Sequence, residues 1–254
     1  MYNMQYQHLK SLLVLAENTA RDAAREVLKD VAAIRKVKVD LRRDVKIKAD
    51  SKIEEFVVDR LTKQSEYPIL SEESGLIGGS QEGSSYQWIV DPIDGSLNFS
   101  RGIPFCCISI ALWNGAEPLL GVVLDFNRAE VFAGIVGDKA TLNGKPIKVS
   151  DIKKKSKAIL CTGFPVNTDF GSSALHQFVK QVQEYKKVRL LGSAALSLSY
   201  IASGRADIYI ERDIKIWDVA AGCALVKASG GSVLIEWRKD ITEPLTLIAC
   251  NGRL

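Results

Sequence analysis

Histidine is almost absent from this chain, and its scarcity removes several kinds of active site. Only two of the 254 residues are histidine, His8 and His176, and neither lies near other metal-ligating residues at the spacing of a zinc site. A Ser-His-Asp triad would have to use one of these two. Any catalysis is therefore expected to depend on carboxylates.

Paired cysteines and long apolar runs are also missing. The five cysteines are odd in number and include no C-x-x-C pair, so we interpret them as reduced, buried side chains in a reducing compartment. No apolar run approaches the roughly 18 residues that span a bilayer, and no basic-then-apolar leader precedes a cleavage site. These absences predict a cytoplasmic protein without a membrane partner.

The composition is that of an ordinary globular protein. A hydrophobic fraction of 46% with 25% charged residues excludes a disordered or fibrous chain. The net charge of +4 does not require nucleic acid, but it suits an anionic small substrate if the positive charge is local. The polar, lysine-rich connector at 150–156 is the best internal boundary, and it divides one compact unit into residues 1–150 and 151–254.

The N-terminal part of the sequence has the periodicity of a helix. Apolar residues recur at gaps of three and four from Gln5 to Lys36, which predicts a long helix. Ser51, with Glu54 three residues later, is typical of a capping box, so a second helix is expected to begin at 50–51. Asp50 would then lie at the start of a helix, which is a fixed place for a functional carboxylate.

Short strands fill the rest of the first half. Strand-like runs at close spacing predict an antiparallel meander, and Asn143-Gly144 predicts a hairpin. A loop rich in glycine and serine is expected over residues 76–85. The expected strands cover residues 67–70, 87–90, 105–113, 119–126, 130–136, 139–142 and 146–149.

Strands and helices alternate in the second half, which favours a layered α/β arrangement. Gly230-Gly231 is expected to end the last helix. The expected strands cover residues 158–161, 188–191, 207–211, 232–236 and 245–250, and the expected helices cover 172–186, 193–203 and 218–228.

Acidic residues gather where these elements end or begin. Glu72-Glu73 follows one strand, Asp91-Pro92-Ile93-Asp94-Gly95-Ser96 follows the next, and Trp217-Asp218 begins an apolar helix. Each cluster also has an ordinary interpretation. Adjacent acids usually lie on a solvated face, Asp-Pro and Asp-Gly are common turn dipeptides, and Asp218 is a candidate N-cap. Their repeated occurrence at element ends favours a shared function.

The central cluster combines two features that a phosphate ester needs. Pro92 lacks a backbone donor and is expected to end its strand, Gly95 permits a tight turn, and Ser96 can cap a short helix. Such a turn would bring Asp91 and Asp94 together beside backbone N–H groups. Carboxylates hold hard cations such as Mg²⁺, and a helix N-terminus attracts phosphate.

Three motifs resemble the signatures of the inositol monophosphatase family of magnesium-dependent, lithium-sensitive phosphatases. They are Ser71-Glu72-Glu73-Ser74, Asp91–Phe99 and Trp217–Gly222, and the likeness covers nearly the whole chain. The resemblance implies an α+β fold, a layered αβαβα sandwich of the sugar-phosphatase type, and a homodimer. It also implies hydrolysis of inositol 1-phosphate, fructose 1,6-bisphosphate or both, because several archaeal and bacterial members accept both esters.

The resemblance further implies which residues hold two or three Mg²⁺ ions. The ligands would be Glu72, Asp91, Asp94, Asp218 and the backbone carbonyl of Ile93, with Asp91 bridging two ions. Two such metals neutralise charge, activate a water and hold the leaving oxygen without any histidine.

The same resemblance implies catalytic and substrate-binding roles. Asp50 and the Ser96 hydroxyl would help Glu72 to orient the attacking water. Ser96 stands where many members carry threonine, so the hydroxyl is retained. Backbone N–H groups would hold the phosphate, further residues would line the alcohol, and two arginines could meet a second phosphate. The implied substrate contacts are Asp94, Gly95, Ser96, Arg189, Gly192, Ser193, Ala194, Glu211 and Arg212.

The sequence leaves two other functions to compare with this one. A nucleotide 3′-phosphatase of the same superfamily, acting on adenosine 3′,5′-bisphosphate, would need room and contacts for adenine, and residues 192–211 contain no obvious aromatic insertion. A non-catalytic protein that binds anions or nucleic acid could use the basic run 35–48. Aspartates dilute that run and no aromatics interleave it, so no nucleic-acid partner is expected.

Overall fold

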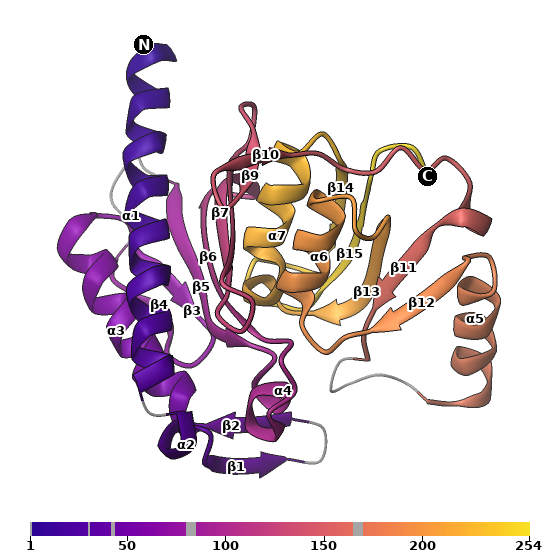
Figure 1. Cartoon of the computed structure of the whole chain (residues 1–254), viewed down its shortest axis with the longest axis horizontal. Coiled ribbons are helices and arrows are strands. Elements are labelled where there is room, and N and C mark those ends of the chain that lie inside the picture. Colours follow the sequence, from indigo (N-terminus) through magenta and orange to yellow (C-terminus); the bar gives the residue numbers. More distant parts are fainter. Residues whose placement is uncertain (1, 30, 42–43, 80–84, 165–169) are drawn as a thin grey trace.

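Five layers make up the molecule, in the order helices, sheet, helices, sheet, helix (Figure 1). The computed structural model describes residues 2–29, 31–41, 44–79, 85–164 and 170–254. It confirms the layered αβαβα sandwich that the resemblance implied. Among the described residues, no helix combines the length and the apolar character needed to cross a bilayer.

The first two layers come from the first half of the chain. The eight-stranded sheet has the order β10-β9-β8-β7-β6-β5-β3-β4, and a separate hairpin pairs β1 with β2. The helices are α1 (Tyr2–Lys29), α2 (Val31–Ile34), α3 (Lys48–Gln64) and α4 (Ser96–Arg101). The strands are β1 (Val37–Leu41), β2 (Asp44–Ile47), β3 (Ile69–Ser71), β4 (Gly75–Ile77), β5 (Tyr86–Asp94), β6 (Cys107–Asn114), β7 (Glu117–Asp125), β8 (Glu130–Ile135), β9 (Ala140–Leu142) and β10 (Lys145–Ile147).

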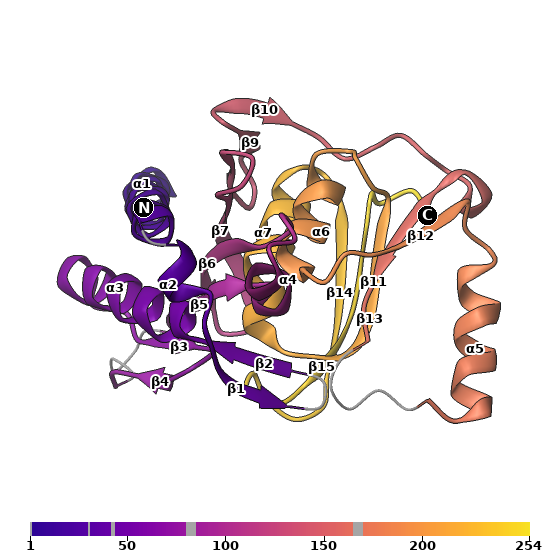
Figure 2. The ribbon, with the colours of Figure 1, turned by 60° about the horizontal axis from the view of Figure 1, so that its bottom comes forward.

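The second half supplies the other three layers. Its five-stranded sheet has the order β12-β11-β13-β15-β14, with α6 and α7 on one face and α5 on the other side (Figures 1 and 2). The helices are α5 (Ser172–Val182), α6 (Ala194–Ala202) and α7 (Ile216–Ala228), with one 3₁₀ turn at Lys155–Lys157. The strands are β11 (Ile159–Thr162), β12 (Lys187–Leu190), β13 (Ile208–Ile214), β14 (Ser232–Trp237) and β15 (Leu245–Cys250).

Side-chain alternation along the central strands divides the core into two layers. On β5, Trp88 and Val90 pack toward α1 and α3, whereas Ile89 packs toward α6 and α7. α7 lies so close to β7 that a Cβ at Gly121 would come within 2.4 Å of the Ala221 carbonyl oxygen. Buried residues of both halves therefore pack together in the layer between the two sheets.

The predicted strands of the first half are largely confirmed. β6, β7 and β8 form the expected antiparallel meander, and β9 pairs with β10 as the expected hairpin. One prediction was wrong: Pro92 does not end its strand. β5 continues through Pro92 to Asp94, and a register shift between Asp91 and Asp94 accommodates the residue that cannot donate to the ladder.

The starts and ends of several helices also differ from the predictions. The long helix predicted over 5–36 ends at Lys29, with α2 after it, and residue 30 lies outside the described residues. Part of the loop predicted over 76–85 is instead strand β4, and residues 80–84 are not described. Ser96 is the first residue of α4 rather than its cap, because Gly95 takes that place with φ of 91°.

The predicted capping box was wrong as well. α3 begins at Lys48, three residues before Ser51, and the Ile47 N–H donates to Asp50 at its start. Glu54 instead accepts hydrogen bonds from the backbone N–H and the hydroxyl of Ser74, at 3.1 and 3.0 Å. That pair of bonds ties the loop that follows β3 to α3.

Candidate active site

Asp50 lies in the first turn of α3 with only 2% of its surface exposed. Its Oδ2 accepts a hydrogen bond from the Ile47 N–H at 2.8 Å. The Ser96 hydroxyl lies 3.0 Å from Asp50 Oδ1 and 2.9 Å from the Ile93 carbonyl oxygen, so it can donate to either. The structure thus brings Asp50 and Ser96 together. A hydroxyl that donates its hydrogen inward keeps its lone pairs available to accept one from water.

Glu72 and Asp91 are neighbours because each directly follows the last residue of the parallel pairing between β3 and β5. Ser71 of β3 lies opposite Val90 of β5, and the Glu72 N–H donates to the Val90 carbonyl at 3.3 Å. A hydrogen bond joins the carboxyl groups of Glu72 and Asp91. The Oδ1 atom of Asp91 is buried and has no hydrogen-bond partner among the described residues.

The N-terminus of α6 holds Asp94. Ser193 is the N-cap of α6, and its hydroxyl donates to Asp94 Oδ2 at 2.5 Å. The Ala195 N–H donates to the same oxygen at 2.7 Å, and the Ala194 N–H lies 3.3 Å from Oδ1. Ser193 and Ala194, which the resemblance placed along the substrate, therefore also fix this carboxylate from a distant part of the chain.

Asp218 completes the acidic cluster from α7. The alternative interpretation of Asp218 as an N-cap is wrong, because α7 begins at Ile216 and Asp218 is its third residue. Its Oδ2 accepts a hydrogen bond from the Lys215 N–H at 3.3 Å, so the side chain satisfies a donor at the start of its own helix.

The four carboxylates Glu72, Asp91, Asp94 and Asp218 share one electrostatic environment. Burial, reinforced by the other three acids, holds the pKa of Asp91 well above its ordinary value. The pKa of Asp218 is raised by burial and then by Glu72 and Asp94. Burial raises the pKa of Asp94 to about 6, although the hydrogen bonds from α6 oppose that rise. Such a cluster needs bound protons or cations to be stable at neutral pH.

The donor set fits a hard divalent cation. All the ligand atoms on offer are oxygens, and Asp91 Oδ1 is buried without a partner. Two carboxyl groups that hydrogen-bond to each other share a proton, which a bound cation would replace. Within the described residues, no group of three or more His, Cys, Asp or Glu has the geometry of a formed metal site. The cluster therefore has the right chemistry, and its side chains would adjust when an ion binds.

Asn98 lies within the central motif, but no local pattern indicated a role for it. Its amide nitrogen lies 2.8 Å from the carbonyl oxygens of Phe105 and Leu191 and 3.3 Å from that of Gly192. Asn98 therefore connects α4 with two backbone segments distant in the sequence. The close approach also requires Gly192, where φ is 72° and a Cβ would lie 2.9 Å from the Asn98 side chain.

We expect Asn98→Ala to lower the unfolding free energy by about 2 kcal/mol, because it leaves partly buried carbonyl groups without a donor. It should also raise KM for the phosphate ester, because α4 and the segment before α6 are no longer joined. Urea unfolding and steady-state kinetics measure the two effects. Ser100→Ala, on the same short helix, removes only a hydroxyl that bonds to Leu97 and serves as the control. Wild-type stability and KM in Asn98→Asp, which cannot donate, would contradict this role.

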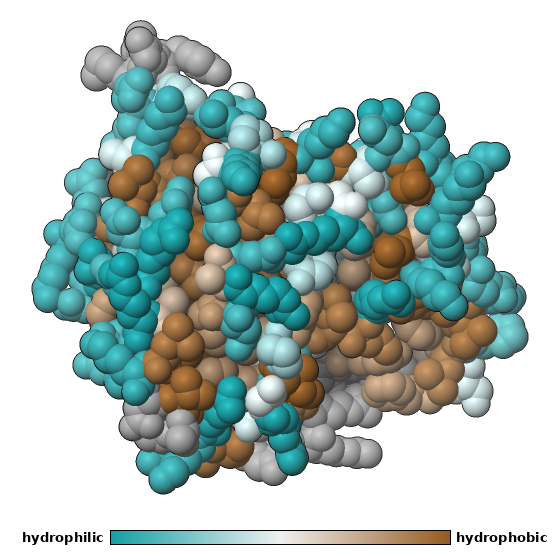
Figure 3. All heavy atoms as spheres, viewed as in Figure 1, coloured by the Kyte–Doolittle hydropathy of each residue, from teal (hydrophilic) through white to brown (hydrophobic). Residues whose placement is uncertain are grey.

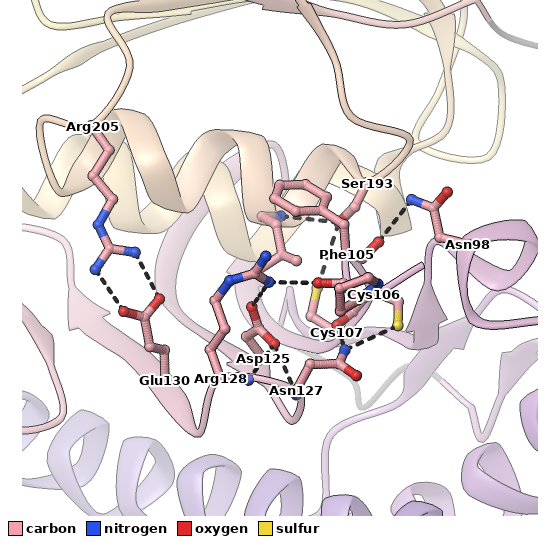
Figure 4. A network of polar contacts seen from close by, with 12 residues as sticks. Asn98, Phe105, Cys106, Cys107, Asp125, Asn127, Arg128, Glu130, Ser193 and Arg205 are labelled. Atoms are coloured by element: carbon pink, nitrogen blue, oxygen red, sulfur yellow. Dashed lines mark hydrogen bonds and ion pairs between the residues drawn. The ribbon is translucent and has the colours of Figure 1, made fainter. Parts of the chain in front are cut away.

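A second network supports the segment that leads into β6 (Figure 4). The buried Asp125 accepts hydrogen bonds from the N–H groups of Asn127 and Arg128 and from the Arg128 guanidinium. Arg128 also donates to the Pro104 carbonyl at 2.6 Å. The segment ends at Cys107, whose thiol lies 3.7 Å from Asp94 Oδ2. Sequence reasoning also missed this contact, because it read all five cysteines only as buried apolar residues.

Glu211 borders the cluster, whereas the two predicted arginines do not join it. Tyr209, another residue that sequence reasoning missed, donates its hydroxyl to Glu211 Oε2. Burial raises the pKa of Glu211 to about 7, and the charge of Asp94 adds to this rise. Arg189 lies exposed on the edge strand β12 and donates to the neighbouring Val188 carbonyl. Arg212 is exposed and lines a cavity beside Glu211.

Comparison with known proteins agrees with this architecture. The chain is 33% identical over 246 residues to an inositol-1-monophosphatase of Mesorhizobium japonicum, which covers 95% of this chain and 92% of that protein. It is 38% identical over 208 residues to a Nus factor SuhB of Xylella fastidiosa, covering 81% of this chain and 73% of the relative. The inositol monophosphatase structure from Anabaena superposes with a TM-score of 0.82 at 32% identity, covering 97% and 92% of the two chains.

The layered fold and the carboxylate cluster define a phosphoric monoester hydrolase. The model of the inositol monophosphatase family matches residues 8–251, and the chain belongs to that family. The family is in general dependent on Mg²⁺ and acts on phosphate esters. The suhB protein of Bartonella henselae, with a TM-score of 0.85, 31% identity and coverage of 96% and 95%, has the same fold.

Proposed function

We propose that this enzyme hydrolyses inositol 1-phosphate, fructose 1,6-bisphosphate or both, with Mg²⁺ held by Glu72, Asp91, Asp94, Asp218 and the carbonyl of Ile93. The observation that carries the proposal is the buried Asp91 oxygen without a partner inside a cluster of four acids. Two or three ions would balance the charge of this cluster. When bound, such cations withdraw charge from the phosphate and make water more acidic.

The residues around the cluster would position the reactants. The backbone N–H groups of Gly95 and Ser96 open α4 and would donate to the phosphate oxygens. Asp50 fixes the Ser96 hydroxyl, so that this hydroxyl and Glu72 can hold the attacking water in line with the phosphorus. Ser193 and Ala195 keep Asp94 in place while the alcohol departs.

The name Nus factor SuhB belongs to the relatives that carry it. We propose no nucleic-acid partner for this chain. The guanidinium of Arg35, the first base of the run 35–48, lies 5.3 Å from the centre of the Phe99 ring and packs inward.

A homodimer, which the family resemblance implied, is part of the same proposal, and light scattering after size exclusion tests it.

Phosphate release from a panel of three esters tests the function. The panel contains inositol 1-phosphate, fructose 1,6-bisphosphate and adenosine 3′,5′-bisphosphate. We expect turnover of at least one of the first two, loss of activity in excess EDTA, and recovery with Mg²⁺ because the acids lose their counter-charge without it. Li⁺ is expected to inhibit by occupying a metal site. Turnover that persists in EDTA would refute the metal assignment, and failure on every ester would refute the proposed substrates.

A further inference from the structure

A cavity of about 550 Å³ opens beside the carboxylate cluster, between β13 and α5. Glu211 lines this cavity. The same carboxylate is near enough to Asp218 for its charge to raise the pKa of Asp218, so the cavity lies next to the carboxylate cluster. The volume lies within the range of small-molecule binding sites. The residues that line it and carry the argument are Phe164, Gln177, Phe178, Gln181 and Glu211.

One wall of the cavity is aromatic and unusually exposed. The rings of Phe164 and Phe178 pack together with their centres 4.9 Å apart. Phe164 is nevertheless 39% exposed and Leu175 is 40% exposed. None of the residues of α5 is buried, and apolar side chains reach the surface over this helix (Figure 3). Phe164 also packs against Phe170, with ring centres 5.5 Å apart, and still keeps part of its surface exposed at the cavity.

Polar groups line the cavity both on β13 and on α5. Gly163 lies so close to Glu211 that a Cβ there would come within 2.4 Å of Oε2, so the floor of the cavity is narrow at that point. Gln177 and Gln181 lie one turn apart on α5 and line the cavity. Their side-chain amides can donate and accept hydrogen bonds, which suits the polar edge of a nitrogen-containing ring.

We propose that this cavity binds the alcohol part of a phosphate monoester that carries a flat, nucleoside-sized aromatic ring. The ring would stack on Phe164 and Phe178 while the phosphate lies at the carboxylate cluster. The inference rests on the proposed phosphatase function and names a substrate class for the same site. In the hydrolysis, the water oxygen bonds to phosphorus, the bond from phosphorus to the alcohol oxygen breaks, and that oxygen takes a proton from the water.

The aromatic residues come from a part of the chain that sequence reasoning did not consider. The objection to a nucleotide substrate concerned residues 192–211, which contain no aromatic insertion. Phe164 follows β11 and Phe178 lies on α5, and only the tertiary structure brings both to the cavity that Glu211 lines.

Kinetics with Phe178→Ala test the ring contact. We expect this variant to raise KM for 1-naphthyl phosphate and adenosine 3′-monophosphate about five- to tenfold, the loss of one stacking partner. KM for inositol 1-phosphate should stay within about twofold, since that ester has no aromatic ring. Val179→Ala is the matched control, because Val179 is the next residue of α5, is 55% exposed and does not line the cavity.

Calorimetric binding of phosphonates separates this inference from the phosphatase function, because a phosphonate has no ester bond to cleave. Naphthylmethylphosphonate should bind more tightly than methylphosphonate, and Phe178→Ala should remove the difference. That result without turnover of any ester would support the cavity and refute the proposed function. Equal binding of the two phosphonates, or equal effects of both variants on all esters, would overturn the cavity inference and leave the phosphatase intact.

Discussion

Asp94→Asn is expected to lower kcat by about 10³-fold while the protein stays folded. The substitution keeps the volume of the side chain and removes a negative charge from the cluster that would hold Mg²⁺. An asparagine oxygen can still accept the hydrogen bonds from Ser193 and Ala195. Phosphate release at saturating Mg²⁺ measures the activity, and circular dichroism during heating shows whether the fold is retained.

The control for Asp94→Asn is Asp240→Asn, which changes a carboxylate that is exposed and bonds only locally to Thr242 and Glu243. It should leave kcat unchanged. In EDTA, Asp94→Asn should melt at the same temperature as the wild type or higher, because it relieves repulsion among buried acids. Near-normal turnover in Asp94→Asn would refute the metal assignment.

The metal-free protein is expected to lose stability as the pH rises through about 6. Burial raises the pKa of Asp94 to about 6 and that of Glu211 to about 7 in the folded state. The folded protein therefore binds more protons than the unfolded chain between their ordinary pKa values and these raised ones. Stability is full below the ordinary values and is lost as the raised groups ionise. For Asp94 alone the loss is about 3 kcal/mol.

Urea unfolding in EDTA at about pH 5 and about pH 7.5 measures this dependence, which Asp94→Asn should reduce. Added Mg²⁺ should stabilise the protein more at the higher pH, because protons compete with the cation for the same oxygens. Groups with lowered pKa values, such as Glu130 beside Arg205, act in the opposite direction, but only at lower pH. An unfolding free energy in EDTA that is constant or rises across this range would contradict the expectation.

Local patterns predicted the strands of the meander, but they missed β1, β2 and β4 and misplaced the start of α3. Strand-like runs at close spacing predicted β6, β7 and β8, because strands buried on both faces are apolar along nearly their whole length. The start of α3 was misplaced because Ser51 and Glu54 have the spacing of a capping box. Glu54 bonds instead to Ser74, which lies 20 residues further along the chain. A tertiary contact took a side chain that the local pattern assigned to the helix.

The sequence by itself determined the family and predicted the chemistry: the scarcity of histidine favoured catalysis by carboxylates, and three motifs indicated the family and the candidate acids. These signals are local, so they can be read along the chain. Only the tertiary structure decided what holds those acids and what lies beside them. Backbone N–H groups at the N-terminus of α6 donate hydrogen bonds to Asp94, which lies 100 residues earlier in the chain. α5 brings Phe178 to the cavity beside Glu211. Both depend on packing between distant segments, for which no spacing of residues in the sequence is a signal.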